Sequence, residues 1–108
     1  NYFDMAGLDE SPFMMYAVNV KKNKIKEIPA ITHVDNTCRI QTLKKDFNIN
    51  FYNLINEFYK ITGIPILLNT SFNLAGEPMV ESIEDALNTL HKSKINYLYL
   101  PEYHLLIE

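Results

Sequence analysis

A run of five apolar residues, Ile64–Leu68, constrains the fold of this chain more than any other feature. The run has the length of a strand. Successive side chains of a strand point to opposite faces, so an unbroken apolar run predicts a strand that is covered on both faces. Polar residues begin abruptly after it with the segment Asn69–Asn73, which reads Asn-Thr-Ser-Phe-Asn. In open α/β sheets, ligands bind beyond the carboxyl ends of the strands, so this segment is the first candidate for a binding site.

The clearest helical pattern lies directly before this run, over Phe51–Thr62. Its apolar residues recur at intervals of three and four and form one stripe, which we expect to lie in the core. Asn50 is the expected N-cap, and Gly63 stands where a glycine commonly ends a helix.

The C-terminal part of the chain predicts a second helix followed by two strands. The helix covers Ser82–Lys92, and Ser82 with Asp85 approximates a capping box. Its expected buried stripe consists of Ile83, Ala86, Leu87 and Leu90. Asn96–Leu100 and His104–Ile107 are rich in β-forming residues and are expected to be strands.

The N-terminal part predicts strands joined by polar turns. Residues 1–11 (Asn1 to Ser11) are expected to be a connecting segment, since Gly7 and the Ser-Pro step are turn signals. The expected strands are Phe13–Val20, Glu27–Ile31 (an edge strand, because it contains a proline) and Thr37–Leu43. The order of strands, helix, strand, loop, helix and strands indicates an α/β (α+β) chain that is one domain or part of one.

The composition is that of a soluble globular protein, with 47% hydrophobic and 21% charged residues. A net charge of −3 argues against a nucleic-acid-binding module, and no apolar run approaches the ~20 residues that span a membrane. The single cysteine, Cys38, excludes an internal disulfide, so we expect a cytoplasmic protein. Cys38 itself is expected to be a small buried residue rather than a nucleophile.

The segment after the apolar run carries four uncharged hydrogen-bonding side chains: Asn69, Thr70, Ser71 and Asn73. Amides and hydroxyls can donate to phosphate or carbonyl oxygens, and backbone N–H groups of such a turn can add to an anion site. The alternative is a loop that satisfies its own backbone through Asx and Ser turns. Residue chemistry alone leaves both interpretations open.

Arg39 is the one cation within an apolar strand pattern. A guanidinium in that position needs a partner, and its planar fork suits a phosphate or carboxylate of a ligand. A structural ion pair is the alternative, and it also stays open.

His33, Asp35 and Glu77 are further polar candidates. His33 and Asp35 share a face if the chain is extended there, which gives half of a metal site, but no third ligand has matching spacing. A structural, hydrogen-bonded histidine is the favoured interpretation. For Glu77 we favour a role in orienting its loop over a catalytic role. Their roles cannot be assigned from the sequence.

Several long motifs in this order resemble the nodulation-type O-carbamoyltransferases. Residues 28–42, IPAITHVDNTCRIQT, are similar to that family's THVDGTAR-containing segment. Residues 62–73, TGIPILLNTSFN, with GEPMV at 76–80, resemble a second family motif, and SIEDAL at 82–87 resembles a third. The resemblance covers nearly the whole chain. Asn36 replaces the glycine that is usual after the Asp.

The resemblance implies a two-part enzyme. Its N-terminal domain, of the actin-like ATPase type with an iron-type metal site, transfers a carbamoyl group to the hydroxyl of a small-molecule acceptor. Its C-terminal domain has a YrdC-like fold, a twisted mixed open sheet flanked by helices, which binds ATP and carbamoyl phosphate and forms a carbamoyl-adenylate. Residues 1–108 are expected to be the later, incomplete portion of that C-terminal domain.

By the same resemblance, Arg39, Asn69 and Ser71 are the implied catalytic residues, and Thr70 and Asn73 join them in binding the nucleotide. Arg39 would offset phosphate charge, while Asn69 and Ser71 would orient the carbamoyl amide. No metal ligand is expected within the chain. The family's basic phosphate-binding residues would precede Asn1, so we expect a half-site that is inactive alone.

Two alternatives stand beside the transferase. One is a non-catalytic nucleotide-binding or interaction module of the same fold. The other is an RNA-binding module, which the acidic net charge disfavours.

Overall fold

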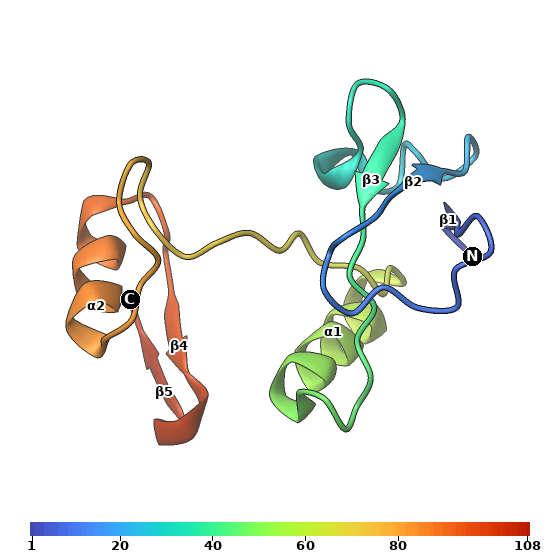
Figure 1. The fold of residues 1–108 in the computed structure, drawn as a ribbon. Coiled ribbons are helices and arrows are strands. Elements are labelled where there is room, and N and C mark those ends of the chain that lie inside the picture. Colours follow the sequence, from blue (N-terminus) through green and yellow to red (C-terminus); the bar gives the residue numbers. More distant parts are fainter. The chain divides into compact units, whose positions relative to one another are not determined.

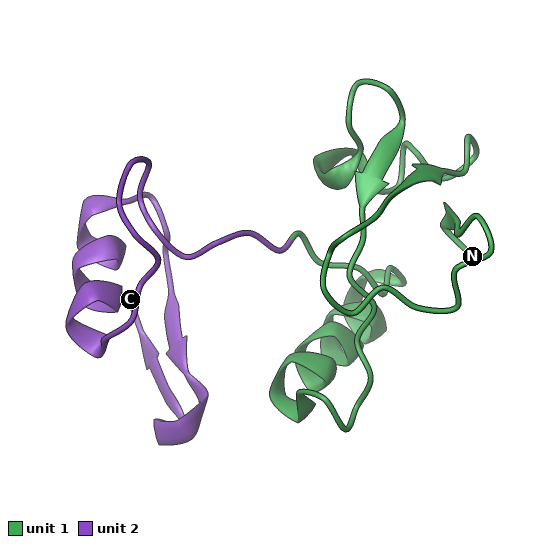
Figure 2. Ribbon diagram, in the orientation of Figure 1, with its two compact units in different colours: residues 1–68 green, residues 69–108 purple.

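The computed structural model describes residues 1–108, which divide into two compact units, Asn1–Leu68 and Asn69–Glu108 (Figure 2). Each unit has its own small sheet, helix and hydrophobic cluster, and each is described by itself below (Figure 1).

The first unit contains a three-stranded antiparallel sheet in the order β1-β2-β3. The strands are β1 (Phe3–Asp4), β2 (Ala17–Val20) and β3 (Thr37–Arg39). Alternate residues of the central strand β2 are buried, as expected for a sheet with one covered face. The core on that face consists of Val18, Val20, Ile28, Cys38 and Ile40.

The strands of the first unit differ from the expected ones in extent. Residues 1–11, expected as a connection, contribute β1. The strand predicted from Phe13 begins only at Ala17, since Met14 adopts a positive φ of 54° that interrupts the extended chain. The strand predicted over Glu27–Ile31 is wrong: the proline opens a 3-10 turn, Pro29–Ile31. A proline favours the first turn of a helix, where its missing N–H costs nothing.

Helix α1 (Ile49–Thr62) confirms the predicted helix and its C-terminus. Gly63 ends it in the left-handed conformation (φ 74°), and the Gly63 N–H donates to the Tyr59 carbonyl. The N-cap is Asn48, not the predicted Asn50; its side chain accepts a 3.0 Å hydrogen bond from the Phe51 N–H. None of the helix's side chains is fully buried, so the predicted core stripe is only half-covered.

The run Ile64–Leu68 forms no strand, which contradicts the first expectation from the sequence. Its chain pairs with none of the five strands, although Ile64 and Ile66 pack against the core of the first unit. A strand exists only where a neighbour accepts and donates its backbone hydrogen bonds, and apolar composition alone does not supply one.

The second unit contains α2 (Ile83–Lys92) and a two-stranded antiparallel sheet of β4 (Leu98–Leu100) and β5 (Leu105–Ile107). These elements confirm the predicted helix and closing strands. Ser82 is the N-cap, and both hydrogen bonds of a capping box with Asp85 are present. The core of this unit is small and consists of Ala86, Leu90 and Leu98.

The architecture is therefore α+β, with two small antiparallel sheets. The twisted mixed sheet implied by the resemblance is not observed in residues 1–108, because every strand pair there is antiparallel. A YrdC-like fold stays a prediction. Neither helix has the length and apolar character needed to cross a bilayer.

Candidate functional site

Arg39 ends β3 with an exposed side chain, on the face of the sheet opposite to the buried Cys38. Its backbone lies opposite Ala17 of β2, which fixes its position in the sheet. The three ion pairs of the structure each join a lysine to a glutamate, and none includes Arg39. The structural ion pair considered from the sequence is therefore not formed within the first unit, and the guanidinium is open to a ligand.

The turn before β3 holds His33 and Asp35 through hydrogen bonds to Thr37. The Asp35 Oδ1 atom accepts from the Thr37 hydroxyl at 2.7 Å and from the Thr37 N–H at 3.0 Å. The bond from the Thr37 hydroxyl, and to a lesser extent the bond from its N–H, hold the pKa of the Asp35 carboxyl below its usual range. The His33 Nδ1 atom lies 3.1 Å from the Thr37 Oγ1 atom. The favoured interpretation of His33 as a hydrogen-bonded histidine is confirmed.

In the second unit, Asn69, Thr70 and Ser71 are exposed and stand in irregular chain. The hydroxyls of Thr70 and Ser71 have no hydrogen-bond partner in the chain, so neither residue caps its own loop. Their donors are available to a ligand.

Asn73 differs from these residues, because its side chain closes the loop that follows. The Asn73 Nδ2 atom donates to the carbonyls of Leu74 at 3.1 Å and Glu77 at 2.9 Å. Gly76 turns the chain there with a φ of 84°, which favours glycine. Asn73 thus fits the self-satisfied loop that was the alternative interpretation, whereas Thr70 and Ser71 do not.

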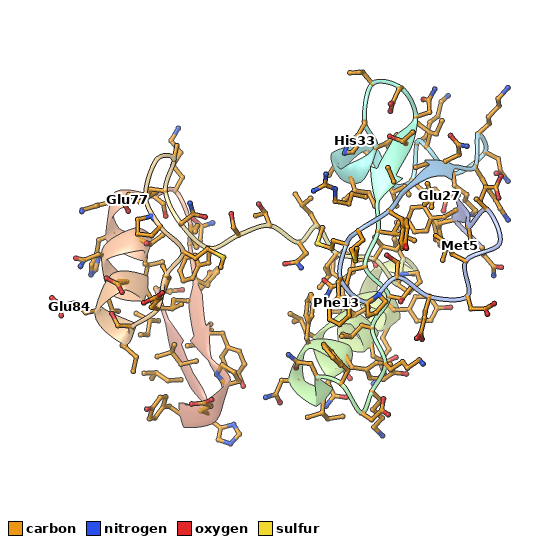
Figure 3. All side chains as sticks on the ribbon, viewed as in Figure 1. Met5, Phe13, Glu27, His33, Glu77 and Glu84 are labelled. Atoms are coloured by element: carbon orange, nitrogen blue, oxygen red, sulfur yellow. The ribbon has the colours of Figure 1, made fainter.

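Glu77 takes part in this loop through its backbone. Its N–H donates to the Leu74 carbonyl at 3.0 Å, and its carbonyl accepts from Asn73. The residue is exposed, in the loop that precedes α2 (Figure 3). The structure thus gives the Glu77 backbone a part in shaping its loop.

Arg39 belongs to the first unit and the Asn69–Asn73 segment to the second. Each has been located in its own unit, and their assembly into one site stays a prediction.

Cys38 lies in the core of the first unit with 3% of its surface exposed. Burial raises the pKa of its thiol, which disfavours the reactive thiolate. The expectation of a small buried residue is confirmed. Within residues 1–108, no group of three His, Cys, Asp or Glu side chains lies close enough together to hold a metal ion.

A shallow depression of about 550 Å³ in the first unit contains none of the five residues implied to bind ATP and carbamoyl phosphate. It lies between β2 and the 33–37 turn, and its lining includes Lys21 and Lys22 but also the carboxylates of Asp4 and Asp35. Because both signs of charge are present in equal number, the depression does not select an anion.

Thr37 is a polar residue of this region that the sequence did not single out. It connects the Asp35 carboxylate to the His33 ring. The signal was present, since an aspartate two residues before a hydroxyl and N–H donor is the spacing of an Asx turn.

Comparisons with known proteins show the family of this chain. A family model described as carbamoyltransferase C-terminus matches residues 1–106. An uncharacterized protein of Methanocaldococcus jannaschii, MJ1051, is 53% identical over 93 residues, which are 86% of this chain and 18% of that protein. Nodulation protein NolNO of Sinorhizobium fredii is 44% identical over 94 residues, 87% of this chain and 14% of that protein.

A third relative carries the name of an enzyme. The 3'-hydroxymethylcephem-O-carbamoyltransferase of Amycolatopsis lactamdurans is 33% identical over 76 residues, 70% of this chain and 14% of that protein. The chain spans less than a fifth of the length of each of these relatives. Since the family model covers residues 1–106, this chain belongs to the carbamoyltransferase C-terminus family.

Proposed function

We propose that this chain is part of an O-carbamoyltransferase and contributes to the site that binds ATP and carbamoyl phosphate. Carbamoyl phosphate takes up water and releases phosphate, which leaves carbamate. A carbamate oxygen then bonds to the α-phosphorus of ATP, and pyrophosphate leaves, which forms carbamoyl-adenylate. In an N-terminal actin-like domain, which would hold an iron-type metal site, the hydroxyl oxygen of a small-molecule acceptor takes over the carbamoyl group, and AMP and the hydroxyl proton leave.

The observation that carries the proposal is the exposed guanidinium of Arg39, which no carboxylate of its unit pairs with. The strand β3 holds the Arg39 backbone in place, so the guanidinium reaches a ligand from a defined position of the sheet. A guanidinium offsets the negative charge on a phosphate and binds it in a bidentate manner.

The exposed segment 69–71 supports the same proposal with neutral groups. The hydroxyls of Thr70 and Ser71 are unbonded within the chain, and a hydroxyl can both donate and accept. Neutral groups suit the carbamoyl amide, which presents N–H donors and a carbonyl acceptor. Asn69 and Ser71 would orient this amide, and Thr70 would contact the nucleotide. Asn73 would act through the shape of the loop.

The test uses the full-length protein that contains this chain. Arg39→Ala should lower carbamoyl-phosphate-dependent release of pyrophosphate from ATP by about 100-fold or more, as the loss of a charge-stabilising donor usually does. Lys26→Ala is the matched control, because Lys26 is also exposed and forms no ion pair. Near-normal release by Arg39→Ala would contradict the proposal, as would an equal loss in both variants.

A further inference from the structure

Three polar side chains in the turn at residues 33–37 are joined by hydrogen bonds, with Thr37 between Asp35 and His33. The Thr37 hydroxyl lies 2.7 Å from the Asp35 Oδ1 atom and 3.1 Å from the His33 Nδ1 atom. A hydroxyl has a single proton and can donate to only one of these two atoms. The shorter contact goes to an ionised carboxylate, which can only accept, so Thr37 donates to Asp35.

This direction of donation fixes the proton of the His33 ring. Thr37 can only accept from His33, because its proton is already used. The Nδ1 atom therefore carries the hydrogen in the neutral ring, and the Nε2 atom holds the free lone pair. The structure thus assigns His33 a defined acceptor, the Nε2 atom.

Backbone hydrogen bonds make the turn rigid around this chain of side chains. The His33 N–H donates to the Thr37 carbonyl at 2.8 Å, and the Asn36 N–H donates to the His33 carbonyl at 2.9 Å. Val20 of β2 donates its N–H to the Asn36 carbonyl at 2.9 Å, which ties the turn to the sheet. His33 is nevertheless exposed, beside the 3-10 turn and β3 (Figure 3). These hydrogen bonds thus hold the imidazole of His33 in place although the side chain is exposed.

Arg39 stands on the same face of β3 as Thr37. Side chains alternate along a strand, and the residue between them, Cys38, is buried on the other face. Two residues of strand span roughly 6.6 Å, so the Arg39 side chain starts close to that of Thr37. His33, held at the Thr37 hydroxyl, therefore supplies an acceptor on the face of β3 that carries Arg39.

We propose that His33 is a specificity-determining residue of the site that contains Arg39, and that its Nε2 atom accepts a hydrogen bond from the N–H of a carbamoyl group. Arg39 pairs with the phosphate of the same ligand. The inference rests on the proposed function, since it names which part of carbamoyl phosphate each residue contacts. Acetyl phosphate has the same shape but carries a methyl group in place of the amide, so His33 disfavours it. An Nε2 atom that the bound ligand covers without offering a donor costs binding free energy.

The first test measures binding of carbamoyl phosphate and acetyl phosphate to the full-length protein by calorimetry without ATP. The unmodified protein should prefer carbamoyl phosphate by roughly tenfold or more, the usual value of one well-placed hydrogen bond. His33→Asn should bring the two affinities to within about twofold of each other. Its amide can still donate to Thr37 and preserve the turn, but it lacks the Nε2 atom. His104→Asn is the control, because His104 is exposed and adopts a φ of 50°, which asparagine tolerates.

The outcomes separate the inference from the proposed function. If the unmodified protein binds neither ligand, the proposed function fails. If it prefers carbamoyl phosphate and His33→Asn retains that preference, the role of His33 is overturned while the function stands. A loss of preference in His33→Asn but not in His104→Asn supports both.

The second test reads the His33 proton directly. Full-length protein labelled with 15N-histidine is measured by solid-state NMR, and the His33 signals are assigned as those missing from His33→Asn. The neutral ring should show a protonated Nδ1 atom. In Thr37→Val the bond that fixes the tautomer is lost, and both tautomers should be seen, whereas Thr37→Ser should restore the single one. A protonated Nε2 atom in the unmodified protein would overturn the assignment.

Discussion

The capping box of α2 gives a sharp prediction about how the second unit holds together. The Ser82 Oγ atom accepts from the Asp85 N–H at 3.1 Å, and the Asp85 Oδ2 atom accepts from the Ser82 N–H at 3.1 Å. Ser82→Ala removes the acceptor and leaves one N–H of the first turn unsatisfied. Losses of this kind cost about 1 kcal/mol, which is a factor of about five in the opening equilibrium of the helix.

Amide hydrogen exchange of α2 measures this change, and each rate is compared with its intrinsic rate. The amides of Ala86 and Leu90 should exchange about fivefold faster in Ser82→Ala, since both residues are buried on the face that the cap stabilises. Ser82→Thr keeps the hydroxyl and is the control, with exchange within about twofold of the unmodified protein. If Ser82→Ala and the unmodified protein show equal protection of these amides, packing and not the cap stabilises the first turn of α2.

The same box predicts a pH dependence of determined sign. The Ser82 hydroxyl, followed by the Ser82 N–H, lowers the pKa of Asp85 from its usual value of 3.8. A carboxyl whose pKa is lower in the folded state stabilises that state above its usual pKa and loses this effect as the pH falls through the folded value. Protection of α2 should therefore decline below pH 3.8 in the unmodified protein, and this decline should be smaller in Ser82→Ala. An identical decline in both would assign the effect to other groups.

Two further changes test the ends of α1 and the shape of the polar loop. Gly63→Ala should destabilise α1 by about 1 kcal/mol, because a residue with a Cβ atom is strained at the left-handed φ of 74°, even though no atom crowds that Cβ. Gly63→Asn should cost less, because asparagine tolerates this conformation. Far-UV circular dichroism in urea measures both changes. Asn73→Ala removes both loop-closing hydrogen bonds and should raise the hydrogen-exchange rate of the Glu77 amide severalfold. Ser71→Ala is the control and should leave this rate unchanged. Equal rates in the two variants would refute the conclusion that Asn73, and not Ser71, closes the loop.

Local structure was predictable from the sequence where it depends on short-range contacts. The capping box of Ser82 and Asp85 and the left-handed Gly63 each involve residues within one turn. The antiparallel pair β4 and β5 is separated by only four residues, so its pairing also depends on nearby groups. These features need no information about distant parts of the chain.

The apolar run Ile64–Leu68 shows where sequence reasoning fails. Ile64 and Ile66 of this run are partly buried against the first core, in partial agreement with its composition. Composition does not say which strand would donate to its carbonyls, and no strand of residues 1–108 does so. The strand predicted over this run is therefore absent, since apolar composition does not supply a pairing partner.

The candidate site was predictable at the level of the motif but not of the individual residue. Asn73 and Ser71 lie two residues apart in one polar segment, and both could bind a ligand or their own loop. Only the geometry separates them, because Asn73 donates to two carbonyls of its loop and Ser71 to none. Likewise the sequence could not decide whether Arg39 had an ion-pair partner, which depends on the side chains of distant segments.

Helix α1 shows what periodicity does and does not determine. Its stripe correctly predicted a helix, yet no side chain of its 14 residues is fully buried, and Leu54 keeps 56% of its surface exposed. An isolated helix of this length is marginal in water, since packing usually supplies most of a helix's stability. The Asn48 cap and the left-handed Gly63 satisfy backbone groups at the two ends of α1. The apolar stripe of α1 therefore predicts the helix itself but not how completely its side chains are buried.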